Sequence, residues 1–309
     1  MKNRAVPAQV ERATISKRRP KTTEAKPATP LLGAHMSIAG GPVRALERGR
    51  SIGCLAVQMF VKNNMQWFAK PFAAAELDAF RSFADRPLSV FGHSSYLINP
   101  GANKVDILEN SVRSLEQELG RAHELRLPFL VLHPGSHLGD GERAGLDRII
   151  GCLDLVFSRL PRGNKVRIAL EVTAGQGSTI GHRFSQLAQI VKGSTYSRRL
   201  AVCLDTAHLF AAGYDISTEK GFWKTIDEFD REIGLDRLVA WHLNDSKTKL
   251  GSRVDRHEHI GRGAIGLAPF REIMRSSAFA NVPKVLETPK GPDLAEDVEN
   301  LAVLRGLLE

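Results

Sequence analysis

Short apolar runs alternate with longer amphipathic segments along the chain from residue 31 onward. The short runs are rich in β-branched residues and have the length of buried strands, and the longer segments carry apolar residues at helical spacing. The pattern therefore predicts a series of strand and helix units. The expected strands cover residues 32–35, 55–61, 88–93, 129–133, 166–171, 201–205, 238–242 and 284–287.

A helix is expected after each of these strands. Residues typical of element boundaries mark two of these units: Gly53 follows the first helix and Pro128 opens the fourth strand. Eight strands, each followed by a helix over about 250 residues, favour a single-domain α/β fold, the (β/α)8 TIM barrel. No dinucleotide-binding or P-loop fingerprint occurs at a strand–helix turn, which argues against the common open-sheet folds. The expected helices cover residues 42–52, 73–85, 104–126, 143–160, 183–191, 218–233, 267–276 and 294–308.

The composition is that of a globular protein without membrane segments. Of 309 residues, 42% are hydrophobic and 25% charged, and no apolar run approaches the roughly 20 residues of a membrane span. The N-terminus lacks the apolar core of a secretory signal. Cys54, Cys152 and Cys203 form no Cys-x-x-Cys pair, which argues against disulfides and a thiolate metal site. We therefore expect a cytoplasmic protein.

The basic charge is concentrated at the N-terminus. The whole chain carries a net charge of +9, of which residues 1–30 contribute +6 from eight Lys and Arg and two Glu. This segment is rich in Pro, Ala and Thr, which predicts a disordered basic tail over 1–30 ahead of a barrel domain over 31–309. Such a tail suits non-specific contacts with DNA phosphates and equally suits a solubilising leader.

Six of the eight expected strands end in a residue that can bind a divalent metal. The active sites of TIM barrels lie at the C-terminal ends of their strands, so these side chains are expected to meet at one rim. Each residue alone is as compatible with a structural role, but six together indicate a shared metal cluster. They are His93, His133, Glu171, Asp205, His242 and Glu287.

Three further candidate ligands lie in the loops. His208 follows Asp205 in an Asp-x-x-His pair, and Asp255 and His257 alternate in an extended segment. Nine nitrogen and oxygen donors without a thiolate favour zinc, with manganese as the alternative, and exceed the needs of one tetrahedral ion. Two or three closely spaced ions can clamp both oxygens of an in-line phosphoryl displacement, which points to phosphodiester hydrolysis.

Several longer segments resemble one known family. They read Gly-Ala-His-Met-Ser (33–37), His-Ser-Ser-Tyr-Leu-Ile-Asn (93–99), His-Pro-Gly-Ser-His (133–137), Glu-Val-Thr-Ala-Gly-Gln-Gly (171–177), Leu-Asp-Thr-Ala-His-Leu-Phe-Ala-Ala-Gly-Tyr-Asp (204–215), His-Leu-Asn-Asp-Ser-Lys (242–247), Gly-Ser-Arg-Val-Asp-Arg-His-Glu-His-Ile-Gly (251–261) and Leu-Glu-Thr (286–288). With them the chain resembles the endonuclease IV family of zinc-dependent apurinic/apyrimidinic (AP) endonucleases, which act in base excision DNA repair. The resemblance extends over essentially all of residues 31–309.

The resemblance implies three zinc ions, with manganese possible at one position. His93 and His133 would hold one ion, and Glu171 would bridge it to a second ion. Asp205, His242 and Glu287 would complete the second site, and His208, Asp255 and His257 would hold the third ion.

The resemblance also implies the reaction. A metal-bridging hydroxide, oriented by Glu171, would attack the phosphate 5′ to an abasic deoxyribose. The products would be a 3′-hydroxyl and a 5′-deoxyribose phosphate, and removal of 3′-blocking groups is an expected companion activity. The partner would be duplex DNA, bound by a monomeric, DNA-associated enzyme.

The expected DNA contacts lie in rim loops. The resemblance implies that the segment 62–67 and the pair Tyr96 and Leu97 enter the DNA where the abasic nucleotide is flipped out. The alternative for this pair is ordinary packing over the barrel mouth. Basic residues of the loop 247–256 suit phosphate contacts, or simply a solvated loop. The candidates are Lys62, Asn63, Met65, Trp67, Tyr96, Leu97, Arg253 and Arg256, with Lys247 and Lys249 beside them.

Four positions depart from the family pattern. Met65 stands where the family can have an inserting arginine, Ser94 where an aspartate is common, Val172 where an asparagine is common, and Arg262 where an acidic residue is found. None is a candidate ligand. They therefore concern the residues expected to enter the DNA and the surroundings of the metals, and they do not change the expected reaction class.

Two other functions are compatible with parts of the pattern. A divalent-metal sugar isomerase or epimerase of the same barrel type would need one or two ions and would leave His208, Asp255 and His257 without a role. A non-catalytic protein that binds damaged DNA would not need Glu171. The number of metal ions per chain tests the first alternative, and incision of a duplex with one abasic analogue tests the second.

Overall fold

Eight parallel strands form a closed barrel in the computed structural model, which describes residues 29–84 and 87–309. Around the barrel the strands follow the order β1-β10-β7-β6-β5-β4-β3-β2. They are β1 (Leu32–His35), β2 (Ala56–Phe60), β3 (Ser89–His93), β4 (Phe129–Leu132), β5 (Arg167–Glu171), β6 (Leu200–Asp205), β7 (Leu238–His242) and β10 (Lys284–Leu286). Each lies within one residue of its expected boundaries, and the expected (β/α)8 barrel is confirmed.

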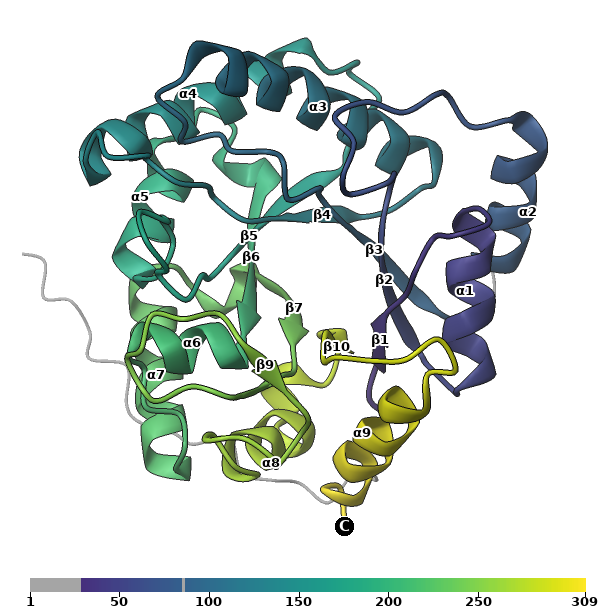
Figure 1. Ribbon diagram of the computed structural model, residues 1–309, viewed down its shortest axis with the longest axis vertical. Coiled ribbons are helices and arrows are strands. Elements are labelled where there is room, and N and C mark those ends of the chain that lie inside the picture. Colours follow the sequence, from purple (N-terminus) through teal and green to yellow (C-terminus); the bar gives the residue numbers. More distant parts are fainter. Residues whose placement is uncertain (1–28, 85–86) are drawn as a thin grey trace, which may run out of the picture.

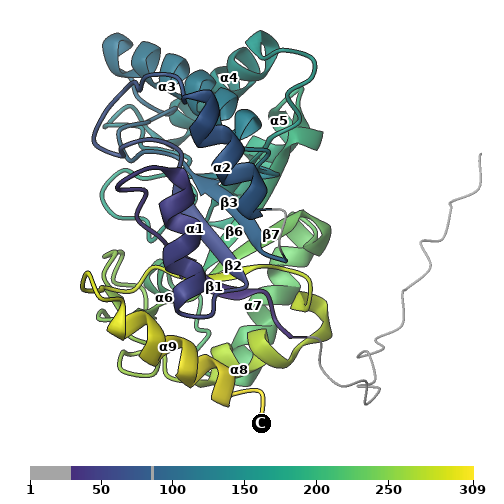
Figure 2. The ribbon, with the colours of Figure 1, turned by 90° about the vertical axis from the view of Figure 1, so that its right-hand side faces the viewer.

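Helices surround the barrel on all sides, as Figures 1 and 2 show. Their starts follow local rules: Pro42 occupies the first turn of α1, and the Thr218 hydroxyl accepts a hydrogen bond from the Gly221 N–H at the start of α7. The expected helices are α1 (Pro42–Ser51), α2 (Ala74–Ala84), α3 (Val105–Glu124), α4 (Glu142–Arg159), α5 (Phe184–Gly193), α7 (Glu219–Glu232), α8 (Ala268–Arg275) and α9 (Ala295–Gly306).

Several short elements were not expected from the sequence. Helix α6 (Thr206–Ala212) spans only seven residues, too few for helical periodicity to identify it. Strands β8 (Asp245–Ser246) and β9 (His257–Glu258) form a two-residue antiparallel ribbon across a long loop. The described residues also contain three short 3-10 turns, at Ser197–Arg199, Leu235–Arg237 and Ser277–Phe279.

The barrel interior is a packed core. Side chains alternate along each strand, so one set packs against the helices and the other set points inward. The inward set is mostly small, with two larger rings, Phe91 and Phe129, whose centroids are 4.8 Å apart. Its members are Ala56, Phe91, Phe129, Val131, Ala169, Ala201, Cys203, Ala240 and Val285.

Two expectations concern regions beyond this core. The disordered tail expected over 1–30 falls almost wholly on residues 1–28, which lie outside the described residues. Among the residues that the structure describes, no helix combines the length and apolar character needed to cross a membrane.

Candidate metal centre

The inward-facing positions change from apolar to polar at the C-terminal end of the barrel. Glu171 lies two residues after the inward Ala169 on β5, and His242 lies two residues after Ala240 on β7. The same step of two holds on every strand, because side chains alternate with that period. We call the resulting ring of side chains the polar top layer. It consists of His35, Gln58, His93, His133, Glu171, Asp205, His242 and Glu287.

The structure brings eight of the nine candidate ligands into three groups, within each of which the ligand atoms lie within 4.8 Å of one another. Glu171 belongs to two of the groups and Asp205 also belongs to two. Asp205 therefore lies close both to the residues expected at the second ion and to the loop residues His208 and His257. The groups are His93, His133 and Glu171; Glu171, Asp205, His242 and Glu287; and Asp205, His208 and His257.

Glu171 is the centre of the arrangement and is fully buried. Its Oε2 lies 2.9 Å from His133 Nε2 and 3.2 Å from His93 Nε2. Its Oε1 lies 2.9 Å from His242 Nδ1 and 3.3 Å from His208 Nδ1. One carboxylate thus faces rings from four different segments of the chain.

The ninth candidate, Asp255, joins the group formed by the loops. Its Oδ2 lies 3.1 Å from His208 Nε2, and its Oδ1 lies 3.3 Å from His257 Nε2. Helix α6 fixes His208, since the Asp205 carboxylate accepts the His208 N–H at 2.9 Å and caps the helix. The ribbon of β8 and β9 brings His257 over the barrel mouth. Helix α6 and the ribbon of β8 and β9, which were not expected from the sequence, therefore form this part of the centre.

Hydrogen bonds to main-chain carbonyls orient three of the rings. A carbonyl oxygen only accepts, so the ring nitrogen that faces it must carry the proton. His93 Nδ1 donates to Ser94 O at 2.7 Å, His208 Nδ1 to Val172 O at 2.9 Å, and His257 Nδ1 to Glu287 O at 3.0 Å. Each ring thereby presents Nε2 to the centre, the arrangement by which proteins fix a metal-binding histidine. Ser94 and Val172 contribute through their carbonyls, which their departure from the family pattern leaves unchanged.

His242 is oriented the other way round, by a side chain that the sequence analysis did not identify. The buried Gln58 amide accepts His242 Nε2–H at 2.7 Å and donates to Glu287 Oε1 at 2.5 Å. Asn244, also missed, donates to Asp205 Oδ2 at 2.6 Å. The available signal was position, since Gln58 occupies the same inward place on its strand as the candidate ligands.

Opposite charges in the centre stabilise the ionised forms of one another, although the site is buried. Burial opposes ionisation of Glu171, but the His242, His133 and His208 rings together outweigh it and hold the pKa of this carboxyl well below its ordinary value. Burial likewise opposes protonation of His257, but Asp205 and Asp255 together outweigh it and raise the pKa of the ring to about 9. The clustered carboxylates therefore favour a bound cation, whether proton or metal.

The residues present fit a metal cluster. Four carboxylates and five imidazoles converge, main-chain carbonyls or the Gln58 amide orient four of the five rings, and no thiolate takes part. This oxygen and nitrogen donor set is the one that zinc and manganese accept in hydrolytic sites. Side chains able to bind metal are thus assembled at the barrel mouth.

The expected DNA-facing residues differ in exposure. Met65 is 71% exposed and Tyr96 is 56% exposed, and the Tyr96 ring lies 5.6 Å from the His93 ring between centroids. Asn63, Arg253 and Arg256 are exposed, whereas Trp67 and Leu97 are partly buried. Lys62 is buried and ion-paired with Glu118, so its ammonium cannot reach a phosphate from this position. Arg262 forms an exposed ion pair with Glu299 at 3.0 Å.

A TIM barrel with a cluster of imidazoles and carboxylates at its C-terminal mouth defines an enzyme of the metal-dependent barrel class. The family model described as xylose isomerase-like TIM barrel matches residues 46–306. Relatives named probable endonuclease 4 are similar over nearly the whole chain. That of Chloroflexus aurantiacus is 46% identical over 284 residues, covering 91% of this chain and 99% of the relative. That of Geobacter sulfurreducens is 47% identical, covering 90% of this chain and 94% of the relative.

A solved structure supports the same relationship. The endonuclease IV from Thermus thermophilus superposes with a TM-score of 0.78 at 37% identity, covering 90% of this chain and 99% of that one. A D-tagatose 3-epimerase-like protein superposes with a TM-score of 0.67 at only 17% identity, which shows a shared fold alone. The chain belongs to the endonuclease IV family.

Proposed function

We propose that this chain is a DNA-repair endonuclease that hydrolyses the phosphodiester 5′ to an abasic site in duplex DNA. Incision leaves a 3′-hydroxyl and a 5′-deoxyribose phosphate, and the same centre removes 3′-blocking groups. The enzyme acts as a monomer on DNA inside the cell. The observation that carries the proposal is the position of Glu171, whose carboxylate is shared by two donor groups at the mouth of the barrel.

Three zinc ions, with manganese as an alternative at one position, account for all nine donors. His93, His133 and Glu171 suit the first ion. Glu171, Asp205, His242 and Glu287 suit the second, and His208, Asp255 and His257 suit the third, with Asp205 beside it. When bound, zinc polarises the phosphate and stabilises the charge that develops on its oxygens.

The protein side chains position the reactants. The Glu171 carboxylate stays ionised, so it can accept a hydrogen bond from the attacking water and orient it towards the phosphorus. His93 and His133 flank this carboxylate, with their Nε2 atoms 3.2 and 2.9 Å from its Oε2. The Tyr96 ring lies beside both imidazoles, with centroid distances of 5.6 and 5.9 Å.

The rim supplies the DNA contacts. The exposed Met65 and Tyr96 are suited to enter the duplex beside the flipped abasic nucleotide, together with Asn63. Trp67 and Leu97 are partly buried. The exposed Arg253 and Arg256, in the loop that carries Asp255, are suited to phosphates.

A duplex oligonucleotide with a single abasic analogue tests the proposal. The protein with its full zinc complement should nick the strand on the 5′ side of the analogue, and a chelator should abolish nicking. Glu171→Gln should retain the fold and bind the duplex without cutting it. A zinc-loaded wild-type protein that binds this duplex and never nicks it would contradict the proposal.

The epimerase alternative is tested by metal analysis of the purified protein. An epimerase of the same barrel type needs one or two ions, and it gives no role to His208, Asp255 and His257. Three ions per chain, falling to two in a His208→Ala variant, is the expected result. One ion per chain would favour the alternative.

A further inference from the structure

Helix α3 carries a stripe of polar side chains that are mostly buried, although the helix lies on the outside of the barrel. The residues recur at positions i, i+3, i+4 and i+7, which places them on one face of the helix. Ser114 and Glu118 are fully buried and Arg121 nearly so. The stripe, which we call the α3 polar stripe, consists of Ser114, Gln117, Glu118 and Arg121.

The α3 polar stripe binds the main chain of the loop that follows β2. Ser114 Oγ donates to Trp67 O at 2.8 Å, and Arg121 donates to Val61 O at 2.7 Å and to Lys70 O at 2.6 Å. Gln117 accepts the Ala69 N–H at 2.7 Å and donates to Ala69 O at 3.0 Å. Because these contacts reach the backbone, the helix fixes the path of the loop that presents Met65.

Glu118 extends this support to a second rim loop. Its Oε1 lies 2.8 Å from Lys62 Nζ, and both side chains are almost completely buried. Lys62 Nζ also donates to Gln66 O at 2.5 Å. The Glu118 carboxylate accepts the Ser95 N–H at 3.2 and 3.3 Å, directly before Tyr96. One ion pair therefore joins the loop after β2 to the loop after β3.

Stability alone does not account for a buried ion pair at this position. The cost of removing two charges from water usually matches or exceeds their attraction, and apolar side chains of similar size are often as stabilising. Unlike an apolar contact, the pair forms directional hydrogen bonds, since Lys62 and Glu118 each make a second hydrogen bond to the backbone of a different loop. Such bonds fix the distance between the loops.

We propose that Lys62 and Glu118 are positioning residues that set the spacing between Met65 and Tyr96 before DNA binds. The inference rests on the proposed function, in which these two exposed side chains enter the duplex. It assigns Lys62 to loop positioning instead of the DNA contact expected from the sequence. A preset spacing lowers the ordering cost of binding, because the loops need not rearrange around the lesion.

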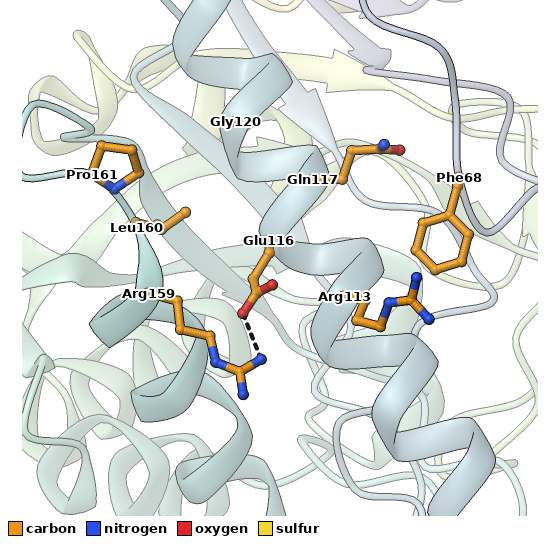
Figure 3. A pocket seen from close by; sticks show the side chains of 8 residues that line it. All are labelled: Phe68, Arg113, Glu116, Gln117, Gly120, Arg159, Leu160 and Pro161. Atoms are coloured by element: carbon orange, nitrogen blue, oxygen red, sulfur yellow. Dashed lines mark hydrogen bonds and ion pairs between the residues drawn. The ribbon is translucent and has the colours of Figure 1, made fainter.

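The neighbouring residue Glu116 provides a matched control. It lies on the same helix but faces α4, where it pairs with Arg159 at 3.0 Å, while Gln117 and Phe68 lie on the other side (Figure 3). The groove between these side chains is lined by no candidate metal ligand. Glu116→Gln thus removes a partly exposed ion pair from α3 without touching either rim loop.

The experiment compares Glu118→Gln with Glu116→Gln in zinc-loaded enzyme on a duplex with one abasic analogue. For Glu118→Gln we expect KM to rise about tenfold or more with kcat within about threefold of wild type, since binding geometry and not the chemical step is altered. The fluorescence of a 2-aminopurine placed opposite the lesion should show weaker unstacking. Glu116→Gln should match wild type in both measurements.

Zinc content must be measured in parallel. Ser94, whose carbonyl orients His93, precedes Ser95, so a displaced loop could disturb the metal centre instead. An unchanged zinc content with a raised KM supports the inference. Equal KM and fluorescence for the two variants, or a Glu118→Gln defect that follows zinc loss alone, would overturn it.

A second variant guards against simple unfolding. Glu118→Gln leaves the Lys62 ammonium buried without a countercharge, which is strongly destabilising. The double variant Lys62→Met/Glu118→Leu replaces the pair with apolar side chains and should restore the thermal midpoint. If positioning is the role, its KM stays raised; a return of KM to the wild-type value would show that the pair serves stability only.

Hydrogen exchange separates this inference from the proposed function. Glu118→Gln should speed amide exchange in both segments 63–67 and 94–97, whereas Glu116→Gln should speed it in neither. Faster exchange in one segment alone would show that the pair does not couple the loops. Wild-type protein that never nicks the abasic duplex would instead refute the proposed function, whatever the exchange result.

Discussion

The Gln58 carbonyl accepts the Nε2–H of His242 at 2.7 Å, and both side chains are fully buried. The amide cannot turn over, because its Nε2 donates to the Glu287 carboxylate, which only accepts. His242 is therefore held with Nδ1 towards Glu171, at 2.9 Å. An uncharged side chain that is no candidate ligand thus fixes the orientation of the His242 ring.

Gln58→Leu should weaken zinc binding. Without the acceptor, the His242 ring can rotate or change tautomer, and loss of such a supporting hydrogen bond typically costs about 10- to 100-fold in metal affinity. Competition with a chromogenic chelator measures the affinity. The unfolding midpoint in excess chelator serves as the control, since a similar midpoint for both proteins assigns the loss to the metal centre. Unchanged zinc affinity would show that the hydrogen bond does not set the ring.

Removal of metal should destabilise the protein as well as stop incision. The carboxylates of Glu171, Asp205 and Glu287 lie close together in a buried site, and a bound cation offsets their repulsion. Thermal unfolding with and without chelator should show a lower midpoint in the metal-free protein. Added zinc should restore both the midpoint and nicking. Identical midpoints would indicate that the centre does not bind metal in the folded chain.

Asp245→Ala should destabilise the loops that carry Asp255 and His257. The fully buried Asp245 carboxylate accepts main-chain N–H groups of Ser246, Gly261, Gly263 and Ile265 at 2.7 to 3.1 Å. Leaving several buried donors without an acceptor should cost about 3 kcal/mol or more in the free energy of unfolding, measured in urea.

Asp230→Ala is the matched control for this change. The Asp230 carboxylate accepts one main-chain N–H, that of Leu235 at 2.8 Å, in an exposed setting. Its loss should cost no more than about 1 kcal/mol. Equal losses of unfolding free energy for the two variants would contradict the role given to Asp245.

Stability should depend on pH through Lys284. Burial lowers the pKa of this ammonium from 10.5 to about 8. Between these values the unfolded chain binds more protons than the folded one, so the contribution of Lys284 to stability rises with pH. Below about pH 8 the cost of a buried charge is fully present. From about pH 7.5 to 9.5 the unfolding free energy of wild type should gain about 2 kcal/mol relative to Lys284→Met.

Replacement of Lys284 also has an effect on stability that does not depend on pH. Lys284 donates to Phe279 O at 2.6 Å and to Val282 O at 2.8 Å, contacts that its replacement also removes. That loss does not vary with pH, so only the difference between the two pH values is informative. A Lys284→Met protein whose unfolding free energy has the same pH dependence as that of wild type would exclude the titration.

Local sequence patterns were enough to predict the strands of the barrel. Each expected strand appears within one residue of its boundaries, since a buried parallel strand is a short apolar run flanked by turns. Helix α6 was missed because seven residues that begin at a strand end show no clear period. The ribbon of β8 and β9 was missed because its partners, Ser246 and His257, pair across a long loop.

The sequence by itself determined the barrel and the strand ends that carry His93, Glu171, Asp205 and His242. Parallel strands put all their C-terminal ends at one rim, so a residue's place along its strand predicts that neighbourhood. The assignment of these residues as metal ligands stays a prediction. The same regularity could have identified Gln58, whose inward position on β2 matches theirs.

Only the tertiary structure decided which side chains meet. Gln58 and His242 are 184 positions apart, and Lys62, in the loop after β2, forms its buried ion pair with Glu118 of helix α3. A basic residue in a rim loop has the same local sequence pattern whether it faces DNA or a buried carboxylate. Its role depends on which neighbours the closed barrel brings around it, and local periodicity contains no information about contacts at that separation.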